Sequence, residues 1–221
     1  VGSEMCIRDS KMEEVTYDEM LEMASLGAKV LHSRCVEIAK KYGVELLVCS
    51  SLNRNSGTMV REKTKMEKML ISGVAADKNV AKIRVAGLGN DPESTFRLLN
   101  LLDRNNLNID VMIQSLGKDG TKSVSFTVAK PDMLRTIDVL NDNKDSLGIK
   151  KLDYDENVAK VSVIGAGVRS HSGVAAKMFG ALANAGINTE MVTTSEIRIT
   201  ALIDEAYADQ AMRAIHETFL E

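Results

Sequence analysis

The sequence predicts an α+β fold, an α/β sandwich of two ferredoxin-like βαββαβ modules, with one module inserted in the other. The first reason is a duplication, because Ala81–Gly87 (AKIRVAG) aligns with Ala159–Gly165 (AKVSVIG) at an offset of 78 residues. The match continues at an offset of 80, where Leu107–Asp110 (LNID) aligns with Ile187–Glu190 (INTE). Repetition of this kind indicates a module that is present twice. The second reason is that the second copy ends one strand short.

The first copy reads as strand, helix, two strands, helix and strand. Its first strand alternates apolar and polar residues, and apolar residues from Phe96 to Leu102 then recur at helical spacing. Lys118–Gly120 (KDG) signals a hairpin, and Pro131 stands where a helix begins, since its missing N–H costs nothing there. The predicted elements are strands Val80–Leu88, Leu107–Leu116, Ser123–Val128 and Ile149–Tyr154, and helices Thr95–Asn105 and Pro131–Leu140.

The second copy repeats this order but stops after its second helix. Its predicted elements are strands Val158–Ile164, Thr189–Thr194 and Ile197–Ile203, and helices Gly173–Ala185 and Ala206–Phe219. A ferredoxin-like sheet without its last strand would leave an open edge. We therefore expect Met69–Ala75, an apolar run before the first copy, to supply the missing strand and to interlock the two modules.

Composition excludes several classes of function. The chain of 221 residues has 28 Lys and Arg against 31 Asp and Glu, with no basic run and only 4% aromatic residues, which argues against nucleic acid as a partner. It has no apolar run long enough to span a bilayer, and we expect no membrane association. The three cysteines lack a metal-ligand spacing, so we expect reduced thiols and a cytoplasmic protein without a metal site.

A family resemblance rests on three motifs of the second copy. These are VSVIGAGVRSHSGVAAKMF (161–179), Gly186–Asn188 (GIN) and Thr193–Ile197 (TTSEI), and together they resemble the C-terminal ACT domain of aspartate kinases, also called aspartokinases. LGAKVLHSR (26–34), with Ser50-Ser51 and Gly57-Thr58, resembles the closing segment of the catalytic domain of the same family. The resemblance covers residues 15–221, as the regulatory region with tandem ACT domains and the tail of the kinase domain.

The resemblance, with the repeat, implies four parts. Residues 1–10 lack periodicity and are interpreted as an artefact leader. Residues 11–65 are expected to be a C-terminal remnant of the amino-acid kinase domain, and the least ordered part of the chain, with Leu21, Leu26 and Val30 exposed. The first ACT module is expected at 78–154, and the second at 66–77 plus 155–221.

The family phosphorylates aspartate with ATP, the first step toward lysine, threonine and methionine, and its ACT pair carries feedback inhibition by lysine, threonine or both. Phosphoryl transfer needs a phosphate-binding loop and cations, and nothing here resembles those motifs. We therefore expect no catalytic residues and no cofactor in this chain, with ATP and Mg²⁺ belonging to a complete kinase, and no activity of the chain alone. Its expected partners are a free amino acid and either a second copy or a full-length kinase subunit.

The resemblance also implies where an effector binds, between the first ACT module of one subunit and the second of another. A zwitterion needs donors and acceptors of hydrogen bonds, and the junctions between a strand and a helix supply both. The candidate effector-binding residues are Asn90, Asp91, Glu93, Ser94, Thr95, Asn108, Asp110 and Gln114 in the first module, and Val174, Ala175, Asn188, Thr189, Ser195 and Glu196 in the second.

Several candidates have plainer interpretations that the sequence leaves open. Asn108 and Asn188 are also typical of turns that enter a strand, and Ser195-Glu196 also fits an exposed strand connection. Asp110 and Gln114 lie four residues apart on one predicted strand, so they share a face, which is also the pattern of a solvated edge.

One loop departs from the family pattern. The first module usually reads Asp-x-Pro-Gly, whereas Asn90–Glu93 (NDPE) has a neutral residue in place of the Asp and a glutamate in place of the Gly. An acidic residue accepts the ammonium of an effector, and glycine permits close approach of the backbone. The alternative function is therefore an assembly subunit whose effector site is degenerate. A fragment of a complete kinase and a genuine short regulatory subunit also remain alternatives.

Overall fold

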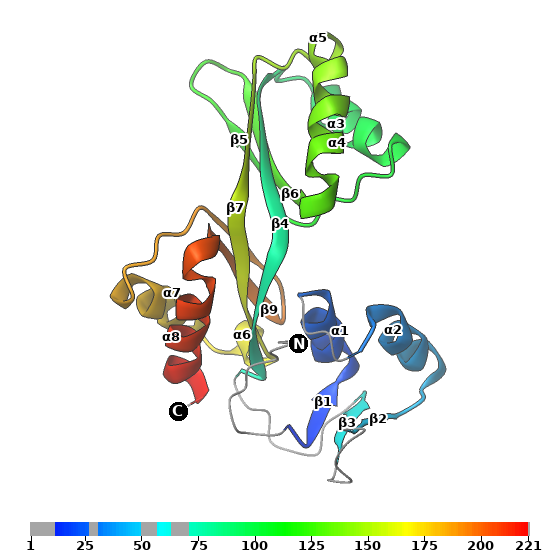
Figure 1. The fold of residues 1–221 in the computed structure, drawn as a ribbon, viewed down its shortest axis with the longest axis vertical. Helices are drawn as coiled ribbons and strands as arrows, with labels where there is room; N and C mark the ends of the chain where they lie inside the picture. Colours follow the sequence, from blue (N-terminus) through cyan, green and yellow to red (C-terminus); the bar gives the residue numbers. More distant parts are fainter. Residues whose placement is uncertain (1–11, 27–30, 50–56, 63–70, 221) are drawn as a thin grey trace. The chain divides into compact units, whose positions relative to one another are not determined.

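The computed structural model describes residues 12–26, 31–49, 57–62 and 71–220 (Figure 1). These residues fall into two compact units. We call Lys78–Ala159 the inner unit, because it is inserted in the sequence of the other unit. The outer unit contains the described residues up to Asp77 and those from Lys160 onward. The predicted fold class is confirmed, since helices and strands alternate in the order of two ferredoxin-like modules.

The inner unit is a sheet covered by helices. Its strands follow the order β5-β6-β4-β7, in which β6 pairs antiparallel with both β4 and β5. Leu98 and Leu102 of the helix α3 pack with Ile83 and Phe126 of the strands in one buried cluster. The elements are β4 (Gly73–Leu88, from Lys78 on), α3 (Pro92–Arg104), β5 (Met112–Leu116), β6 (Lys122–Ala129), η1 (Lys130–Asp132), α4 (Met133–Asp142), α5 (Lys144–Leu147) and β7 (Lys151–Ile164, up to Ala159).

The strands of the outer unit continue the same six-stranded sheet, whose full order is β5-β6-β4-β7-β9-β8. Its part in the outer unit, β4-β7-β9-β8, is called the outer sheet below. The start of β4 supplies its fourth strand, as the incomplete second copy predicted, although this strand begins at Gly73 while Met69 and Leu70 lie outside the described residues. Val161 and Val163 of β7 pack with Met178 and Ile215 of the helices. The further elements are α6 (Gly167–Ser170), α7 (Val174–Asn184), β8 (Met191–Thr194), β9 (Arg198–Asp204), η2 (Glu205–Tyr207) and α8 (Ala208–Leu220).

The N-terminal segment also belongs to the outer unit. Its small sheet has the order β1-β3-β2, with β1 parallel and β2 antiparallel to β3. Val15, Met20 and Met23 share a buried cluster with Ala75 of β4 and Ile164 of β7. The elements are β1 (Glu14–Thr16), α1 (Tyr17–Ser25), α2 (Ser33–Tyr42), β2 (Leu46–Val48) and β3 (Thr58–Arg61).

This packing corrects the expectation of exposed apolar residues in the N-terminal segment. Leu26 is only 1% exposed and Leu21 is half-buried, while Val30 lies outside the described residues. The expectation was wrong for Leu26 because the outer sheet offers α1 an apolar surface, so that the segment buries its side chains there.

Two predicted strand breaks are absent, because β4 and β7 are each continuous. The predicted strands leave the polar triplets Asp77–Asn79 and Asp155–Asn157 outside them, yet both triplets lie inside a strand. The two strands are neighbours in the sheet, and hydrogen bonds from Ser72 N to Ile164 O (2.7 Å) and from Lys150 N to Ala86 O (2.9 Å) set an antiparallel register. Pairing along the sheet therefore overrides the local turn preference of the triplets.

None of the helices in the described ranges is long and apolar enough to cross a membrane.

A buried polar pair in the outer sheet gives a first test of the packing. Ser162 of β7 and Thr200 of β9 are 0% and 2% exposed, and their hydroxyl oxygens lie 2.7 Å apart. Ser162→Ala leaves the Thr200 hydroxyl buried without this partner, which should cost about 1–3 kcal/mol in the free energy of unfolding. The double variant Ser162→Ala/Thr200→Val should lose less than the sum of the two single variants in urea unfolding. Additive losses would show that the two hydroxyls do not stabilise each other.

Candidate functional site

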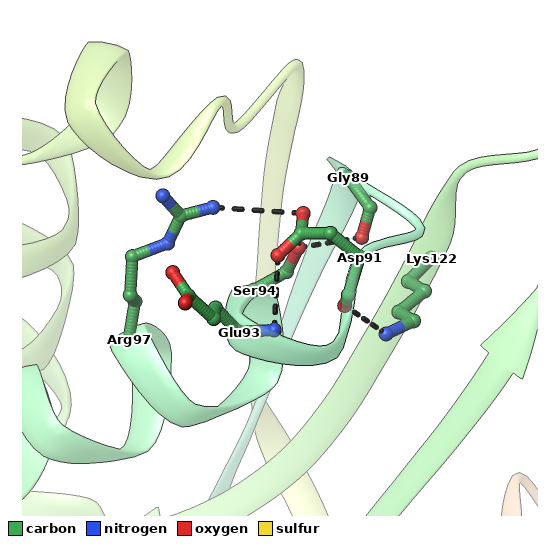
Figure 2. Close-up of polar contacts among 6 residues, drawn as sticks. All are labelled: Gly89, Asp91, Glu93, Ser94, Arg97 and Lys122. Carbon is green, nitrogen blue, oxygen red and sulfur yellow. Dashed lines mark hydrogen bonds and ion pairs between the residues drawn. The ribbon is translucent and has the colours of Figure 1, made fainter.

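Asp91 organises the start of helix α3 (Figure 2). Its carboxylate accepts a hydrogen bond from the Glu93 backbone N–H at 3.0 Å and another from the Ser94 hydroxyl. The Ser94 hydroxyl is buried and also lies 2.6 Å from the Gly89 carbonyl oxygen. Asp91 is thus the N-cap of the helix, and Pro92 fits its first turn because no N–H is needed there. The helix starts three residues before the predicted Thr95 for this reason.

Two cations lie beside the same carboxylate and carbonyl. The Lys122 ammonium donates to the Asp91 carbonyl oxygen at 2.7 Å, and an Arg97 guanidinium nitrogen is 3.6 Å from the Asp91 carboxylate. Lys122 reaches this loop because it stands opposite Leu88 in the register of β6 and β4. Figure 2 shows the Glu93 side chain projecting on the side of Arg97, away from Lys122. The loop therefore presents carboxylates and cations together, as recognition of a zwitterion requires.

These hydrogen bonds fix the charge of Asp91. The Ser94 hydroxyl, above all, lowers the pKa of the Asp91 carboxyl below its ordinary value of 3.8, and the Glu93 N–H and Arg97 act in the same direction against a smaller opposing effect of desolvation. A Cβ on Gly89 would lie 2.5 Å from a carboxylate oxygen of Asp91, so a larger residue at this position would displace the capping side chain. Asp91 is accordingly a structural carboxylate whose acceptor capacity is largely used within the loop.

Thr95 and Gln114 are brought together by the fold. The Thr95 hydroxyl donates to the side-chain oxygen of Gln114 at 2.6 Å, which joins the first turn of α3 to the edge strand β5. Gln114 is exposed and Thr95 is half-buried, and the exposed residues Asn90 and Glu93 lie in the adjoining loop. Five of the candidates in the first copy, Asn90, Asp91, Glu93, Ser94 and Thr95, thus lie in one loop and helix start, with Gln114 beside them.

Asn108 and Asp110 lie away from this group. The Asp110 N–H bonds to the carbonyl oxygen of Thr127, which pairs with Lys82, whereas Leu116 at the other end of β5 pairs with Lys122. Asp110 is four residues of extended chain from Gln114, a distance of about 14 Å at roughly 3.4 Å per residue. One chain therefore does not gather all eight candidates of the first copy into one site.

The predicted shared strand of Asp110 and Gln114 is also corrected. Regular pairing of β5 begins at Met112, so that Asp110 precedes the strand. The buried Thr127 explains the break, because its hydroxyl accepts the Val111 N–H at 3.0 Å in place of a ladder partner. A side-chain hydroxyl that competes with the backbone interrupts the regular ladder.

The second copy divides its candidates in the same way. Ser195 and Glu196 are exposed in the turn between β8 and β9, where the Ser195 N–H bonds to the Arg198 carbonyl oxygen at 2.7 Å. Asn188 and Thr189 are exposed before β8, which starts at Met191 rather than at the predicted Thr189. Because Met191 pairs with Leu202 and Thr194 pairs with Ile199, the two groups lie at opposite ends of the hairpin.

Val174 and Ala175 begin helix α7, whose N-cap Gly173 has a φ of 108°. Val174 is 2% exposed and packs in the core, so its side chain is a structural one, whereas Ala175 is exposed. The loop before this helix is tied to the β8–β9 turn, since the Gly165 N–H donates to the Ile197 carbonyl oxygen at 2.9 Å.

Within the described parts of the chain, no group of three or more His, Cys, Asp and Glu side chains is arranged to hold a metal ion.

Comparison with known proteins identifies the family. Residues 161–219 match the model of an ACT domain. The chain is 42% identical over 215 residues to the aspartokinase of Helicobacter pylori, covering 95% of this chain and 52% of that protein. The structure of aspartokinase alpha and beta subunits is 42% identical with a TM-score of 0.64, covering 67% of this chain and 98% of that chain. The ligand-free regulatory subunit of aspartate kinase from Thermus thermophilus is 33% identical with a TM-score of 0.64, covering 68% and 99%.

The chain belongs to the aspartate kinase family. It comprises the regulatory region with its ACT fold, because that region of the subunit structures is matched over nearly its whole length. It spans about half the length of the curated relatives that it matches.

The sequence did not point to three side chains of this aspartate kinase region that the structure places at the candidate residues. Lys122 and Arg97 lie beside Asp91, and the side chain of Arg198 pairs with Glu22 while its carbonyl oxygen accepts the Ser195 N–H. Arg97 is six residues from Asp91, which is not the spacing of neighbours on a helix face, so this contact could not be predicted without the position of the N-cap. Lys122 needed the strand register, and Arg198 needed the packing of α1 against β9.

The cap at Asp91 gives a pH-dependent prediction. Since the pKa of the folded state is below the ordinary value of 3.8, the carboxylate stabilises the fold fully above that value and loses this contribution as pH falls through the lower pKa. Asp91→Asn keeps a capping side chain without the charge, so its thermal midpoint should fall less than that of the parent on acidification to about pH 3. Asp91→Ala should be less stable than Asp91→Asn at neutral pH. Equal acid sensitivity of the parent and Asp91→Asn in circular dichroism melting would contradict this role.

Proposed function

We propose that this region senses a free amino acid, lysine or threonine or both, and so mediates feedback inhibition of an aspartate kinase. The activity that it regulates is the ATP-dependent phosphorylation of L-aspartate, at the start of lysine, threonine and methionine biosynthesis. ATP and Mg²⁺ would bind to the catalytic part of a complete kinase. The proposal rests on membership of the family and on the geometry around Thr95.

The observation that carries the proposal is the Thr95–Gln114 contact at the edge of the inner sheet. It holds a hydroxyl and an amide together at the start of α3, with the exposed Asn90 and Glu93 beside them. An α-amino acid offers a carboxylate that needs donors and an ammonium that needs acceptors, and this group provides both.

The second half of the site is proposed to come from a second subunit. Asn188, Thr189, Ser195 and Glu196 are exposed polar residues of the outer unit, and in the inner unit Asn108 and Asp110 are exposed as well. Because these residues do not form one group with Thr95 and Gln114, a site assembled across two copies explains all of them. A second copy or a full-length kinase subunit would serve as the partner.

We assign the parts of the chain within the same proposal. Residues 11–65 would be the C-terminal remnant of the amino-acid kinase domain, residues 78–154 the first ACT module, and residues 66–77 plus 155–221 the second. The motifs that resemble the kinase tail, and the repeat of the two modules, support this division.

A second candidate function is assembly without sensing, and the loop at Asn90–Glu93 favours it. The neutral Asn90 stands where the family has an acidic residue, and the neighbouring carboxylate of Asp91 is already occupied by its contacts with Ser94 and Glu93 N–H. An effector ammonium would then have the Glu93 carboxylate as its acidic acceptor in this loop. The two functions make opposite predictions for titration of the parent chain.

Titration calorimetry with lysine, threonine and methionine tests sensing. The parent chain should bind lysine or threonine, and Thr95→Ala and Gln114→Ala should each weaken that binding by about tenfold, the effect of losing one hydrogen bond of about 1.4 kcal/mol. Thr218→Ala removes a hydroxyl that is exposed on α8 and should bind as the parent does. Silence toward all three amino acids at millimolar concentration would remove the sensing function.

The double variant Asn90→Asp/Glu93→Gly decides for or against the assembly function. It restores the acidic acceptor and the close backbone approach of the usual family loop. If the chain serves only in assembly, the variant should gain amino-acid binding that the parent lacks in the same calorimetry. Binding by the parent itself would contradict a purely assembling role.

A further inference from the structure

Helix α1 presents one face to the outer sheet, and this face makes polar contacts at two separate points. Glu19, Glu22 and Met23 lie at helical spacing on that face. The Ser72 hydroxyl donates to the Glu19 carboxylate at 2.5 Å just before β4, and the Arg198 guanidinium pairs with the Glu22 carboxylate at 2.9 Å at the start of β9. The helix is thereby attached both to Ser72, just before β4, and to Arg198, at the start of β9.

Arg198 belongs to the β8–β9 hairpin, whose turn contains the candidate effector residues Ser195 and Glu196. The Arg198 carbonyl oxygen accepts the Ser195 N–H, so its backbone closes the β8–β9 turn while its side chain reaches α1. The neighbouring Ile197 carbonyl oxygen accepts the Gly165 N–H, which binds the turn to the end of β7. Movement of the turn would therefore displace the guanidinium from Glu22.

The ion pair is shielded enough to matter energetically. The side chains of Arg198 and Glu22 are only 17% and 26% exposed, whereas those of Lys40 and Asp18, which pair on another side of α1, are 46% and 57% exposed. Exposed pairs contribute little because water screens them, and partly buried pairs interact more strongly. Loss of either partner would also leave the other charge in a partly desolvated position.

We propose that the Glu22–Arg198 ion pair is a coupling contact, which links the conformational stability of the β8–β9 turn to that of helix α1. The helix belongs to the segment that resembles the tail of the catalytic domain, and the turn carries Ser195 and Glu196. The coupling itself requires no ligand. Its use in regulation, by carrying a change at the turn toward the catalytic segment, rests on the proposed function.

Amide hydrogen exchange of the full chain without any effector tests the coupling. Gly165 and Ser195 report on the turn, and Leu26, whose N–H bonds to the Glu22 carbonyl oxygen at 3.0 Å, reports on the end of α1. Glu22→Gln should speed exchange at Gly165 and Ser195, and Arg198→Met should speed exchange at Leu26, each by roughly threefold to tenfold. The double variant should exchange no faster than the faster single variant.

Lys40→Met is the matched control, because it also removes a cation that pairs with a carboxylate of α1 but makes no contact with the turn. Exchange at Gly165 and Ser195 should stay at the parent rate in this variant. The proposal is overturned if Glu22→Gln leaves both turn amides unchanged, if Lys40→Met speeds them equally, or if the double variant shows additive effects. If Arg198→Met does not fold, Arg198→Lys takes its place, alone and combined with Glu22→Gln, and the same exchange rates are compared.

A second exchange experiment, with an amino acid bound, distinguishes failure of this proposal from failure of the sensing function. With the amino acid that calorimetry identifies, exchange at Leu26 should slow in the parent and stay unchanged in Glu22→Gln, while the dissociation constant is the same in both. Slowing at Leu26 in Glu22→Gln would overturn the regulatory use of the contact. If no amino acid binds, the sensing function fails, whereas the ligand-free exchange rates still decide the coupling.

Discussion

The antiparallel pairing of β4 with β7 is the constraint on which both parts of the six-stranded sheet depend. Each strand gives one part to the inner unit and the other to the outer unit. In the second copy of the module, the fourth strand is the start of β4, which precedes the first copy in the sequence. An ion pair between the half-buried Asp77 and the buried Lys160, at 3.1 Å, lies at the end of the outer unit where both strands leave it. The register of this pairing thus fixes which residues face each core.

In the outer sheet, the register determines which side chains of β7 face each buried cluster. Alternate residues of β7 point to opposite faces, so that Val161 and Val163 meet the helices of their own module while Ile164 meets the cluster of α1. Gly73 lets the helix approach, since a Cβ there would lie 3.3 Å from the Met23 methyl carbon. The N-terminal segment therefore shares a core with the outer sheet and belongs to the same compact unit.

Much of the fold was predictable because periodicity and repetition are properties of the sequence itself. The order of strands and helices and the borrowed strand followed from the repeat at Ala81 and Ala159. The continuity of β4 and β7 did not, since Asp77–Asn79 and Asp155–Asn157 resemble turns unless the partner strand is known. The start of β5 was misplaced for a comparable reason, because the hydroxyl of Thr127 interrupts the ladder from the neighbouring strand. Such errors arise wherever a distant residue decides a local hydrogen bond.

The chemistry of the candidate site was also only partly predictable from the sequence. The sequence singled out NDPE as an altered effector loop, and the structure shows that Asp91, one position after the usual acidic residue, has become the cap of α3. A carboxylate that accepts from Glu93 N–H and Ser94 stabilises the helix start, yet those same bonds reduce what it can offer to a ligand ammonium. Stability of the loop and affinity for an effector thus draw on one side chain. Under the proposed sensing function, Glu93 rather than Asp91 would therefore be the acidic residue of the loop that accepts a ligand ammonium.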